Sequence, residues 1–304
     1  MSMDQDFESI YQKIYDSSVA RLEEVKNKNK KFLEIFVLCL IIVNLIFYII
    51  PLTRFISILL ACLSICILVA FIAIGRHSYV KAYKQCVIDG LVKAYNSNLY
   101  YDATLGISEF DYRASNFDND FNEFTSEDRI HGRFDSGDAI QLAEVTTFKV
   151  THRVNDQGQE IEDREETFRG MYGVVYLNKN SMMNIGIYGD SKMRRYRRDR
   201  IEMDSSEFEQ YYDLVTDDKI RAMRVFTSDL LEKFIDVKKA HKNGVELKVE
   251  WDKIYFRFRC GEIFEPPAFV NGLKKEYLKT FYNHIYYPLE LLDKTVECLN
   301  EVHE

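Results

Sequence analysis

Residues 35–50 read IFVLCLIIVNLIFYII, and residues 55–74 read FISILLACLSICILVAFIAI, with no charged residue in either run. A bilayer core requires roughly 20 helical residues, which the second run supplies and the first approaches. The short connection PLTR lets the chain reverse, and Pro51 disfavours one continuous helix. The two runs therefore predict a transmembrane hairpin, with spans at about 33–50 and 55–75.

Two other interpretations of the apolar runs are disfavoured. A cleavable signal peptide begins near the N-terminus, whereas the first run follows a long polar segment and a second run comes directly after it. A buried helical hairpin in a soluble core is disfavoured because the apolar residues are nearly uninterrupted over both runs.

Orientation follows from the basic residues at the ends of the runs, because Lys and Arg beside membrane spans accumulate on the cytoplasmic side. The connection between the runs offers only Arg54. The outer ends carry Lys26, Lys28, Lys30 and Lys31 before the first run, and Arg76, Lys81 and Lys84 after the second. We therefore expect a cell-membrane protein that crosses the bilayer twice, with both termini in the cytoplasm.

A polar side chain inside the bilayer needs a partner, because an unpaired amide in hydrocarbon is costly. Asn44 lies in the middle of the first run and is expected to hydrogen-bond to the second helix. Ser57, Ala61 and Ser64 recur at helical spacing and give that helix a small-residue face that permits close approach. Asn44 could instead mark a pore or an oligomer contact.

Apolar residues continue at helical spacing beyond both ends of the hairpin, which predicts an antiparallel helical stalk that extends to about Tyr95. A hairpin that is symmetric about its connection fixes the register of this stalk. The predicted pairs are Val25 with Val80, Leu22 with Tyr83, Ile14 with Leu91 and Ile10 with Tyr95. Residues 1–97 thus form the membrane and stalk region, and residues 98–304 form a cytoplasmic domain.

The cytoplasmic domain is predicted to be α+β, with a mixed, mainly antiparallel sheet and packed helices. Residues 129–134, the turn Asp135–Asp138 and the alternating run 139–154 predict a hairpin. REETFRGMYGVVYLN and MMNIGIYG predict further strands of an antiparallel meander. VELKVEW, a turn at Asp252 and KIYFRFRC predict a half-buried hairpin, with the side of Lys253, Tyr255, Arg257 and Arg259 facing away from the core.

Helices are predicted in the second half of this domain. EFEQYYDLVTDD indicates a short helix followed by a strand or turn. Thr227 or Ser228 is expected to cap a helix that runs to about His241. A stripe of Tyr and Leu predicts a terminal helix from Asn271 onward, interrupted at Pro288.

Residues 100–128 are both acidic and aromatic. Asp118, Asp120 and Asn122 match the start of a calcium-binding loop. However, Glu123 stands where that loop requires Gly, and Arg129 stands where it requires Glu. We expect a solvated surface segment here.

The composition excludes several function classes. The formal net charge of −8 disfavours general nucleic-acid binding. The sequence patterns of common hydrolases, metalloproteases and nucleotide-binding proteins are absent, and the six histidines are scattered singly. We predict neither an enzyme activity nor a cofactor or metal. Six cysteines are expected to be reduced thiols: Cys39, Cys62, Cys66, Cys86, Cys260 and Cys298.

Four segments carry a resemblance to a known family. They are FDNDFNEFTSEDRIHGRF, FRGMYGVVYLNK, DSSEFEQYYDLVTDDKIRAMRVFTSDLLEKF and KIYFRFRCGEIFEPP. In this order they resemble bacterial domain-of-unknown-function family 3137, with the run from Phe208 to Phe234 the most specific part and Phe264, Glu265 and Pro266 fitting a further element. The resemblance implies a bacterial, two-span membrane protein, and it brings no activity or functional residue with it.

One charged segment stands out in this acidic chain, because residues 192–200 read KMRRYRRDR. Basic side chains held near a cytoplasmic leaflet attract anionic lipid headgroups. A solvated loop paired with Asp199, Glu202 and Asp204 is the alternative. The candidate residues for binding anionic lipid or a partner are Lys192, Arg194, Arg195, Arg197, Arg198 and Arg200.

The sequence favours a non-enzymatic, membrane-anchored module whose cytoplasmic domain binds the lipid surface or an unknown protein partner. A membrane-bound enzyme is the alternative, with a site assembled from dispersed residues such as Asp217, Asp218, Glu265 and an arginine. A channel or transporter has little support, because the two runs together offer few polar residues.

Overall fold

The computed structural model describes residues 3–49, 54–154, 158–189, 199–241, 243–261, 263–265 and 274–302. The chain divides into two compact units. The first unit holds Met1–Gly90 and Glu265–Leu278, and the second holds Leu91–Phe264 and Lys279–Glu304.

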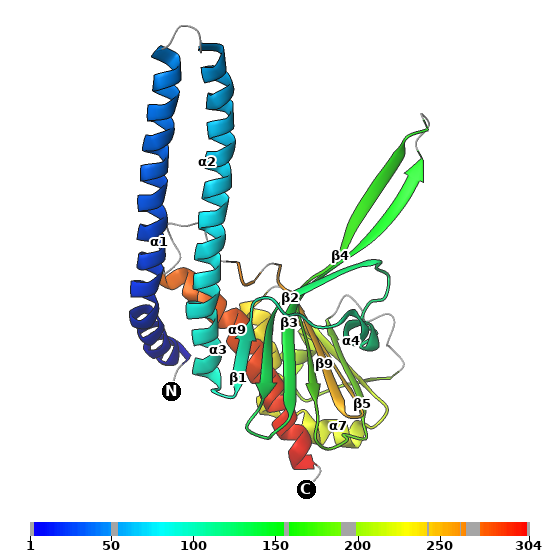
Figure 1. Cartoon of the computed structure of the whole chain (residues 1–304). Helices are drawn as coiled ribbons and strands as arrows, with labels where there is room; N and C mark the ends of the chain where they lie inside the picture. The colour runs from blue at the N-terminus through cyan, green and yellow to red at the C-terminus, as the bar shows by residue number, and fades with distance from the viewer. Residues whose placement is uncertain are drawn as a thin grey trace. The chain divides into compact units, whose positions relative to one another are not determined.

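Two long antiparallel helices, α1 (Met3–Ile49) and α2 (Arg54–Tyr83), make up most of the first unit (Figure 1). A single π-helical turn, η2 (Lys84–Ile88), joins α2 to α3 (Asp89–Tyr95). The helix that follows the hairpin connection therefore continues to Tyr95, which is where the apolar periodicity predicts its end.

Contacts between α1 and the second helix confirm the predicted register in the stalk. Ser18 Oγ donates a hydrogen bond to the Cys86 carbonyl at 3.3 Å, and the Arg21 guanidinium donates to Gln85 Oε1 at 3.3 Å. Each partner neighbours the residue that a symmetric hairpin predicts. The register predicted from the short connection therefore holds at Ser18–Arg21 and Gln85–Cys86.

The expectation for Asn44 is also confirmed. Its Nδ2 donates to Ser64 Oγ on the second helix at 3.1 Å and to the Leu40 carbonyl at 2.8 Å. Ser64 belongs to the predicted small-residue face, while the side chains of Ser57 and Ala61 lie outside the described residues. The amide thus joins the two helices.

Among the described residues of the second unit, nine strands form one sheet in the order β1-β2-β3-β4-β9-β8-β5-β7-β6. Every pair of neighbouring strands is antiparallel. The strands are β1 (Leu99–Asp102), β2 (Glu123–Arg133), β3 (Ala139–Val154), β4 (Glu160–Tyr176), β5 (Asn184–Gly189), β6 (Arg200–Ile201), β7 (Tyr212–Thr216), β8 (Val245–Glu250) and β9 (Lys253–Arg259).

The predicted meander is correct from β2 to β4 and wrong for β5. β4 pairs with β9 over Gly170–Tyr176, whereas β5 pairs with β7 and β8. The tight turn between β8 and β9 brings both strands into the sheet together, so β9 occupies the place that a meander assigns to β5.

β3 and β4 extend beyond their neighbours and form a two-stranded arm (Figure 1). The pairing of β3 with β2 ends at Phe148, and the pairing of β4 with β9 begins at Gly170. Residues 149–154 of β3 and 160–165 of β4 therefore pair only with each other among the described strands.

The acidic and aromatic segment is packed on the sheet, so the expectation of a solvated segment is wrong. Around α4 (Glu109–Ala114), the rings of Tyr112, Phe117 and Phe121 are buried and join a cluster that includes Phe168. The aromatic residues between the acidic ones point to the sheet and supply the burial that stabilises the segment.

This packing also overturns the prediction of a half-buried hairpin. Tyr255 and Arg257, assigned to an outer face of β9, are only 6% and 7% exposed. Arg257 forms an ion pair with Glu246, and its guanidinium lies over the ring of Phe117, 4.9 Å from the centroid. A charge that is paired and stacked in this way can be buried.

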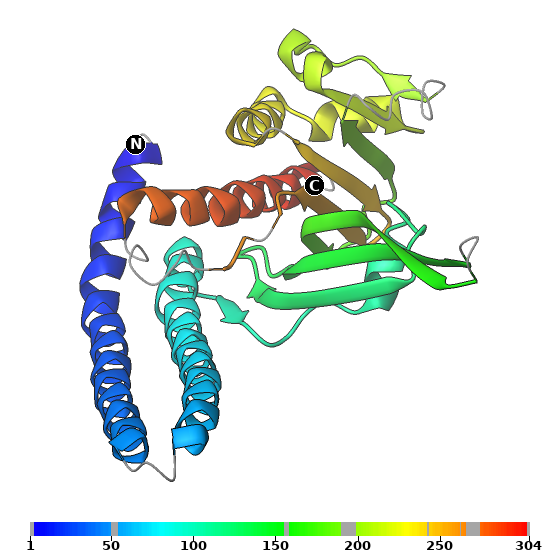
Figure 2. The same cartoon turned by 90° about the horizontal axis from the view of Figure 1, so that it is seen from above.

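Helices cover the opposite face of the sheet, where the ring of Phe258 meets His284 (Figure 2). The predicted short helix is α6. Thr227 occupies the N-cap position of α8, as predicted, but its side chain makes no capping hydrogen bond. The helices are α6 (Ser206–Tyr211), α7 (Lys219–Val225), α8 (Ser228–Ala240) and α9 (Lys275–Val302).

The predicted interruption at Pro288 is wrong, because α9 continues through it. Proline removes one helical hydrogen bond and disfavours the turn before it. Ile285, Leu289 and Leu292 are fully buried on both sides of the proline, and their packing holds the helix together.

Candidate membrane surface and polar pocket

The hairpin exposes a broad apolar surface. In the described part of the chain, one helix, Cys62–Tyr95, is long and apolar enough to cross a membrane, with a mean hydropathy of 1.8 over an 18-residue stretch. The first predicted span lies within α1, where large apolar side chains are exposed as well. These exposed residues on α1 are Ile35, Leu38, Ile41, Ile42, Val43, Leu45, Ile46, Tyr48 and Ile49.

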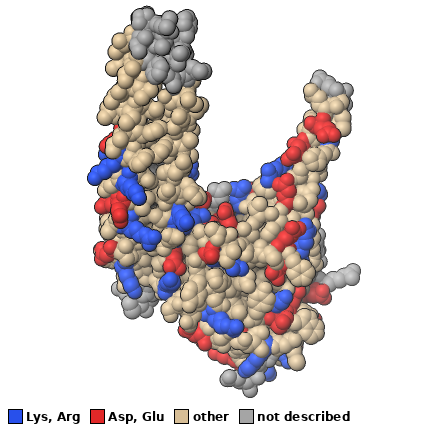
Figure 3. Space-filling view, in the orientation of Figure 1, with Lys and Arg blue, Asp and Glu red and all other residues tan. Residues whose placement is uncertain are grey.

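The described part of this apolar surface carries no charged side chains. In Figure 3, the upper part of the helical hairpin is tan, and blue and red side chains appear only toward its lower part. Exposed apolar side chains such as Leu63, Ile65, Val69 and Ile72 continue the same surface on α2. An uncovered apolar surface of this extent indicates contact with lipid or with protein.

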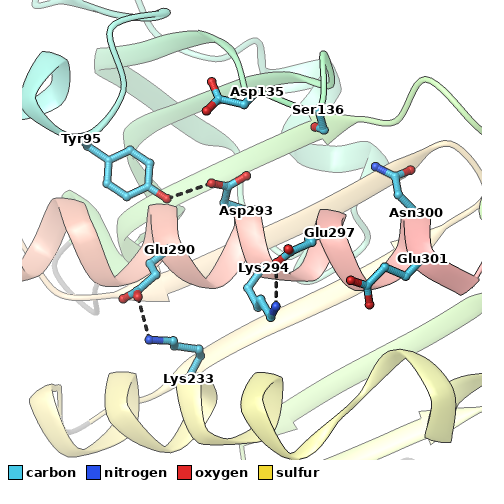
Figure 4. A pocket seen from close by; sticks show the side chains of 10 residues that line it. All are labelled: Tyr95, Asp135, Ser136, Lys233, Glu290, Asp293, Lys294, Glu297, Asn300 and Glu301. Carbon is cyan, nitrogen blue, oxygen red and sulfur yellow. Dashed lines mark hydrogen bonds and ion pairs between the residues drawn. The ribbon is translucent and has the colours of Figure 1, made fainter. Parts of the chain in front are cut away.

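A polar pocket of about 500 Å³ lies in the second unit. Figure 4 shows that α9 supplies most of its wall, with Lys233 from α8 on one side and Tyr95 on the other. The residues that line it are Tyr95, Asp135, Ser136, Lys233, Glu290, Asp293, Lys294, Glu297, Asn300 and Glu301.

Both lysines in this pocket are paired with carboxylates. Lys233 Nζ donates to Glu290 Oε1 at 2.6 Å, and Lys294 Nζ donates to Glu297 Oε2 at 2.6 Å (Figure 4). Carboxylates outnumber the lysines, so the pocket suits a cationic group better than an anionic one.

Asp293 is the carboxylate of this pocket with a shifted pKa. Burial raises its pKa, the nearby charges of Asp135 and Glu297 raise it further, and the hydrogen bond that Tyr95 donates at 3.3 Å partly opposes the shift. Asp293 therefore holds a proton to higher pH than an exposed aspartate.

Of the predicted basic site, the structure describes Arg200 alone. Arg200 lies in β6, where its guanidinium forms ion pairs with Glu209 and, at 2.7 Å, with Asp213. These contacts tie β6 to α6 and β7. Lys192, Arg194, Arg195, Arg197 and Arg198 lie outside the described residues.

The dispersed residues considered for an enzyme site have separate local roles. Asp218 Oδ1 accepts the Arg221 backbone N–H at 3.0 Å and caps α7. Glu265 belongs to the first unit, where it pairs with the buried Lys84 at 3.2 Å. Asp217 lies instead beside a small surface pocket lined by Thr216 and others.

Sequence reasoning missed a pair of partly buried histidines and one buried carboxylate. His241 and His284, treated as isolated, lie with their ring centroids 4.8 Å apart, and burial together with His241 lowers the pKa of His284 to about 4. Burial raises the pKa of Glu144 on β3 to about 7. Neither feature has a local sequence signal, because each arises where distant elements pack together. The described residues contain no metal-binding cluster of three or more His, Cys, Asp or Glu.

The comparisons with known proteins support the resemblance over residues 166–295, so the segment FDNDFNEFTSEDRIHGRF and the two predicted spans lie outside the match. The family described as "Protein of unknown function (DUF3137)" matches residues 166–295. This segment runs from β4 into α9 and includes β9 and the β7–α8 region that carries the most specific part of the resemblance. No curated protein and no solved structure is detectably similar to the chain. In residues 166–295 the chain is thus similar to a family whose function is unknown.

Proposed function

We propose that the protein is a membrane-anchored module: the hairpin crosses the bilayer twice, both termini are cytoplasmic, and the second unit binds a partner or the lipid surface. The exposed, uncharged apolar surface on both α1 and α2 is the observation that carries this proposal. A bilayer is the environment in which such a surface is stable, because in water these exposed apolar side chains of α1 and α2 would be in contact with solvent.

Membrane fractionation tests the anchor. The full chain is expected to stay with the membrane after an alkaline carbonate wash and to need detergent for release. Recovery of the full chain in the aqueous fraction without detergent would overturn the proposal.

Reporter fusions test the two crossings. Alkaline phosphatase, which is active only outside the cytoplasm, is expected to be active when fused in the connection between α1 and α2. It is expected to be inactive when fused after residue 97. Activity at both positions would show that the chain crosses the membrane only once.

The basic segment 192–200 is the proposed lipid or partner contact of the second unit. Each Lys or Arg near an anionic surface adds about 1 kcal/mol of attraction. Replacing Arg194, Arg195, Arg197 and Arg198 with Ser in residues 98–304 is expected to weaken binding to phosphatidylglycerol vesicles and to remove its salt dependence. Circular dichroism verifies that the fragment and its variant are folded, and unchanged binding would remove this part of the proposal.

A membrane-bound enzyme is the second candidate, and the polar pocket is the observation that favours it. A pocket carboxylate with a raised pKa, such as Asp293, is suited to acid–base chemistry. Screening the wild type and Asp293→Asn against a metabolite library by native mass spectrometry tests this candidate. The enzyme candidate requires that the screen find a small molecule that the wild type binds and Asp293→Asn does not.

A further inference from the structure

A hollow lies on the hairpin where the apolar surface meets the first charged residues. Its volume is about 590 Å³, and segments of α1 and α2 line it. Its walls are apolar, formed by Phe32, Leu33, Phe71, Ile72 and Ile74. The polar residues around it are Lys26, Lys28, Asn29 and Lys30, together with Gly75.

The side chains around the hollow fix the distance between the two helices. The rings of Phe32 and Phe71 are stacked, with centroids 5.2 Å apart and planes 4° from parallel, and Phe36 stacks on Phe71 at 5.0 Å. Asn29 Nδ2 donates to the Gly75 carbonyl at 3.1 Å. These contacts hold the helices together, so the hollow is a built feature of the hairpin.

Gly75 keeps the hollow accessible at its polar end. A Cβ at this position would lie 3.6 Å from Asn29 Nδ2, which is ordinary contact distance. A larger side chain would extend past Asn29 and take up space on the wall of the hollow. The substitution Gly75→Leu is therefore a way to reduce the hollow and leave every lysine in place.

The lysines around the hollow are available to an anion. Lys26, Lys28 and Lys30 are all exposed. Lys30 lies 3.8 Å from Glu34, and both side chains remain largely in solvent, so this pair is weak. Within the described part of the chain, Lys26 and Lys28 form no ion pair.

We propose that this hollow binds one anionic glycerophospholipid. Its phosphate would lie against Lys26, Lys28 and Lys30, and an acyl chain would run along the wall of Phe32, Phe71 and Ile72. The two ends of the hollow match the two ends of such a lipid in charge and in polarity, and basic pockets at the cytoplasmic end of membrane helices recognise such headgroups. The inference rests on the proposed function, because it requires the hairpin to be in the bilayer with this end in the cytoplasm.

The test uses the full chain in detergent, after carbonate washing has established that it is a membrane protein. Native mass spectrometry counts the phosphatidylglycerol or phosphatidylcholine molecules that remain bound. The wild type is expected to retain one phosphatidylglycerol in preference to phosphatidylcholine. Equal retention of the two lipids would overturn the inference while leaving the membrane anchor intact, whereas release of the chain by carbonate would overturn the anchor itself.

Matched variants locate the site. Lys26→Gln with Lys28→Gln is expected to weaken phosphatidylglycerol binding by about 25-fold, at about fivefold per lysine. Lys13→Gln with Lys81→Gln removes the same charge from exposed positions elsewhere on the two helices, and binding is expected to be unchanged. An equal loss in the control pair would show that net charge, and not the hollow, attracts the lipid.

Two further experiments identify what is bound. Gly75→Leu retains every lysine and is expected to weaken phosphatidylglycerol binding, because the acyl chain loses its wall. Inorganic phosphate at millimolar concentration is expected to leave the lipid bound. If phosphate displaces the lipid fully, the lysines bind a free anion and the lipid assignment is wrong.

Discussion

Glu144 is expected to make the stability of the second unit depend on pH. Its carboxylate is 7% exposed on β3, and its Oε2 accepts the Ile263 backbone N–H at 3.1 Å. Burial is the largest cause of its raised pKa, the N–H of Ile263 opposes the shift, and the charges of Asp128 and Glu127 add to it. The pKa reaches about 7, compared with the ordinary value of 4.5.

The sign of the effect follows from proton binding. Between pH 4.5 and 7 the folded chain holds a proton on Glu144 that the unfolded chain has lost. The free energy of unfolding therefore falls as pH rises through this window and becomes level above it. A pKa difference of this size corresponds to about 3 kcal/mol in total, with most of it lost between about pH 5 and pH 8.

The variant Glu144→Gln isolates this contribution, because Gln does not titrate and its amide oxygen can still accept the Ile263 N–H. Thermal unfolding of the detergent-solubilised full chain is measured for both proteins across the same pH range. The wild type is expected to lose about 5–10 °C in Tm relative to the variant between about pH 5 and pH 8. Glu165→Gln, at an exposed position on the arm, is the control and is expected to follow the wild type. If wild type and Glu144→Gln show the same pH dependence, the carboxylate titrates normally and the reasoning is wrong.

Three other expectations concern different parts of the second unit. Because the pKa of His284 is lowered, the free energy of unfolding of the wild type should fall by about 2 kcal/mol relative to His284→Gln as pH falls from about 7 to 5. This slope is opposite to that of Glu144, and the same unfolding series measures it. Hydrogen exchange should be fastest in the arm, at residues 150–154 and 160–166, because an isolated two-stranded ribbon is marginally stable; protection equal to that of the rest of β3 would contradict this. Arg257→Ala should destabilise the chain by about 3–5 kcal/mol in denaturant unfolding, because it removes the ion pair with Glu246 and the packing of the buried guanidinium on Phe117, whereas Arg164→Ala on the arm should cost less than about 1 kcal/mol.

Local patterns allowed much of the fold to be predicted. The alternation over 139–154 gives β3 its observed bounds, and the turn at Asp252 joins β8 to β9 as expected. The helix predicted to run to about His241 ends at Ala240, and its Leu230, Leu231, Phe234 and Val237 are buried at helical spacing. In each case neighbouring residues in the chain carry the whole signal.

The errors arise where residues distant in the chain cover one another. Tyr112 and Phe121 are spaced among acidic residues, and their burial depends on a sheet surface formed by β4 and β9. The raised pKa of Glu144 depends on the segment at Ile263, which lies far along the chain. A sequence pattern reports which residues are apolar or charged, and it does not report what will cover them.

The hairpin and the sheet differ in how well the sequence predicts the pairing of their elements. In the hairpin, a connection of a few residues leaves essentially one antiparallel register, so the pairing of Ser18 with Cys86 follows from symmetry even though it lies far from the turn. In the sheet, β4 has a free edge on which either β5 or β9 could pair, and local alternation does not distinguish them. The choice depends on the combined burial of β8, β9 and the helices that cover them, because β8 and β9 can enter the sheet only as one hairpin. Register is therefore predictable wherever a short loop determines the partner, and it becomes unpredictable where the partner itself must be chosen.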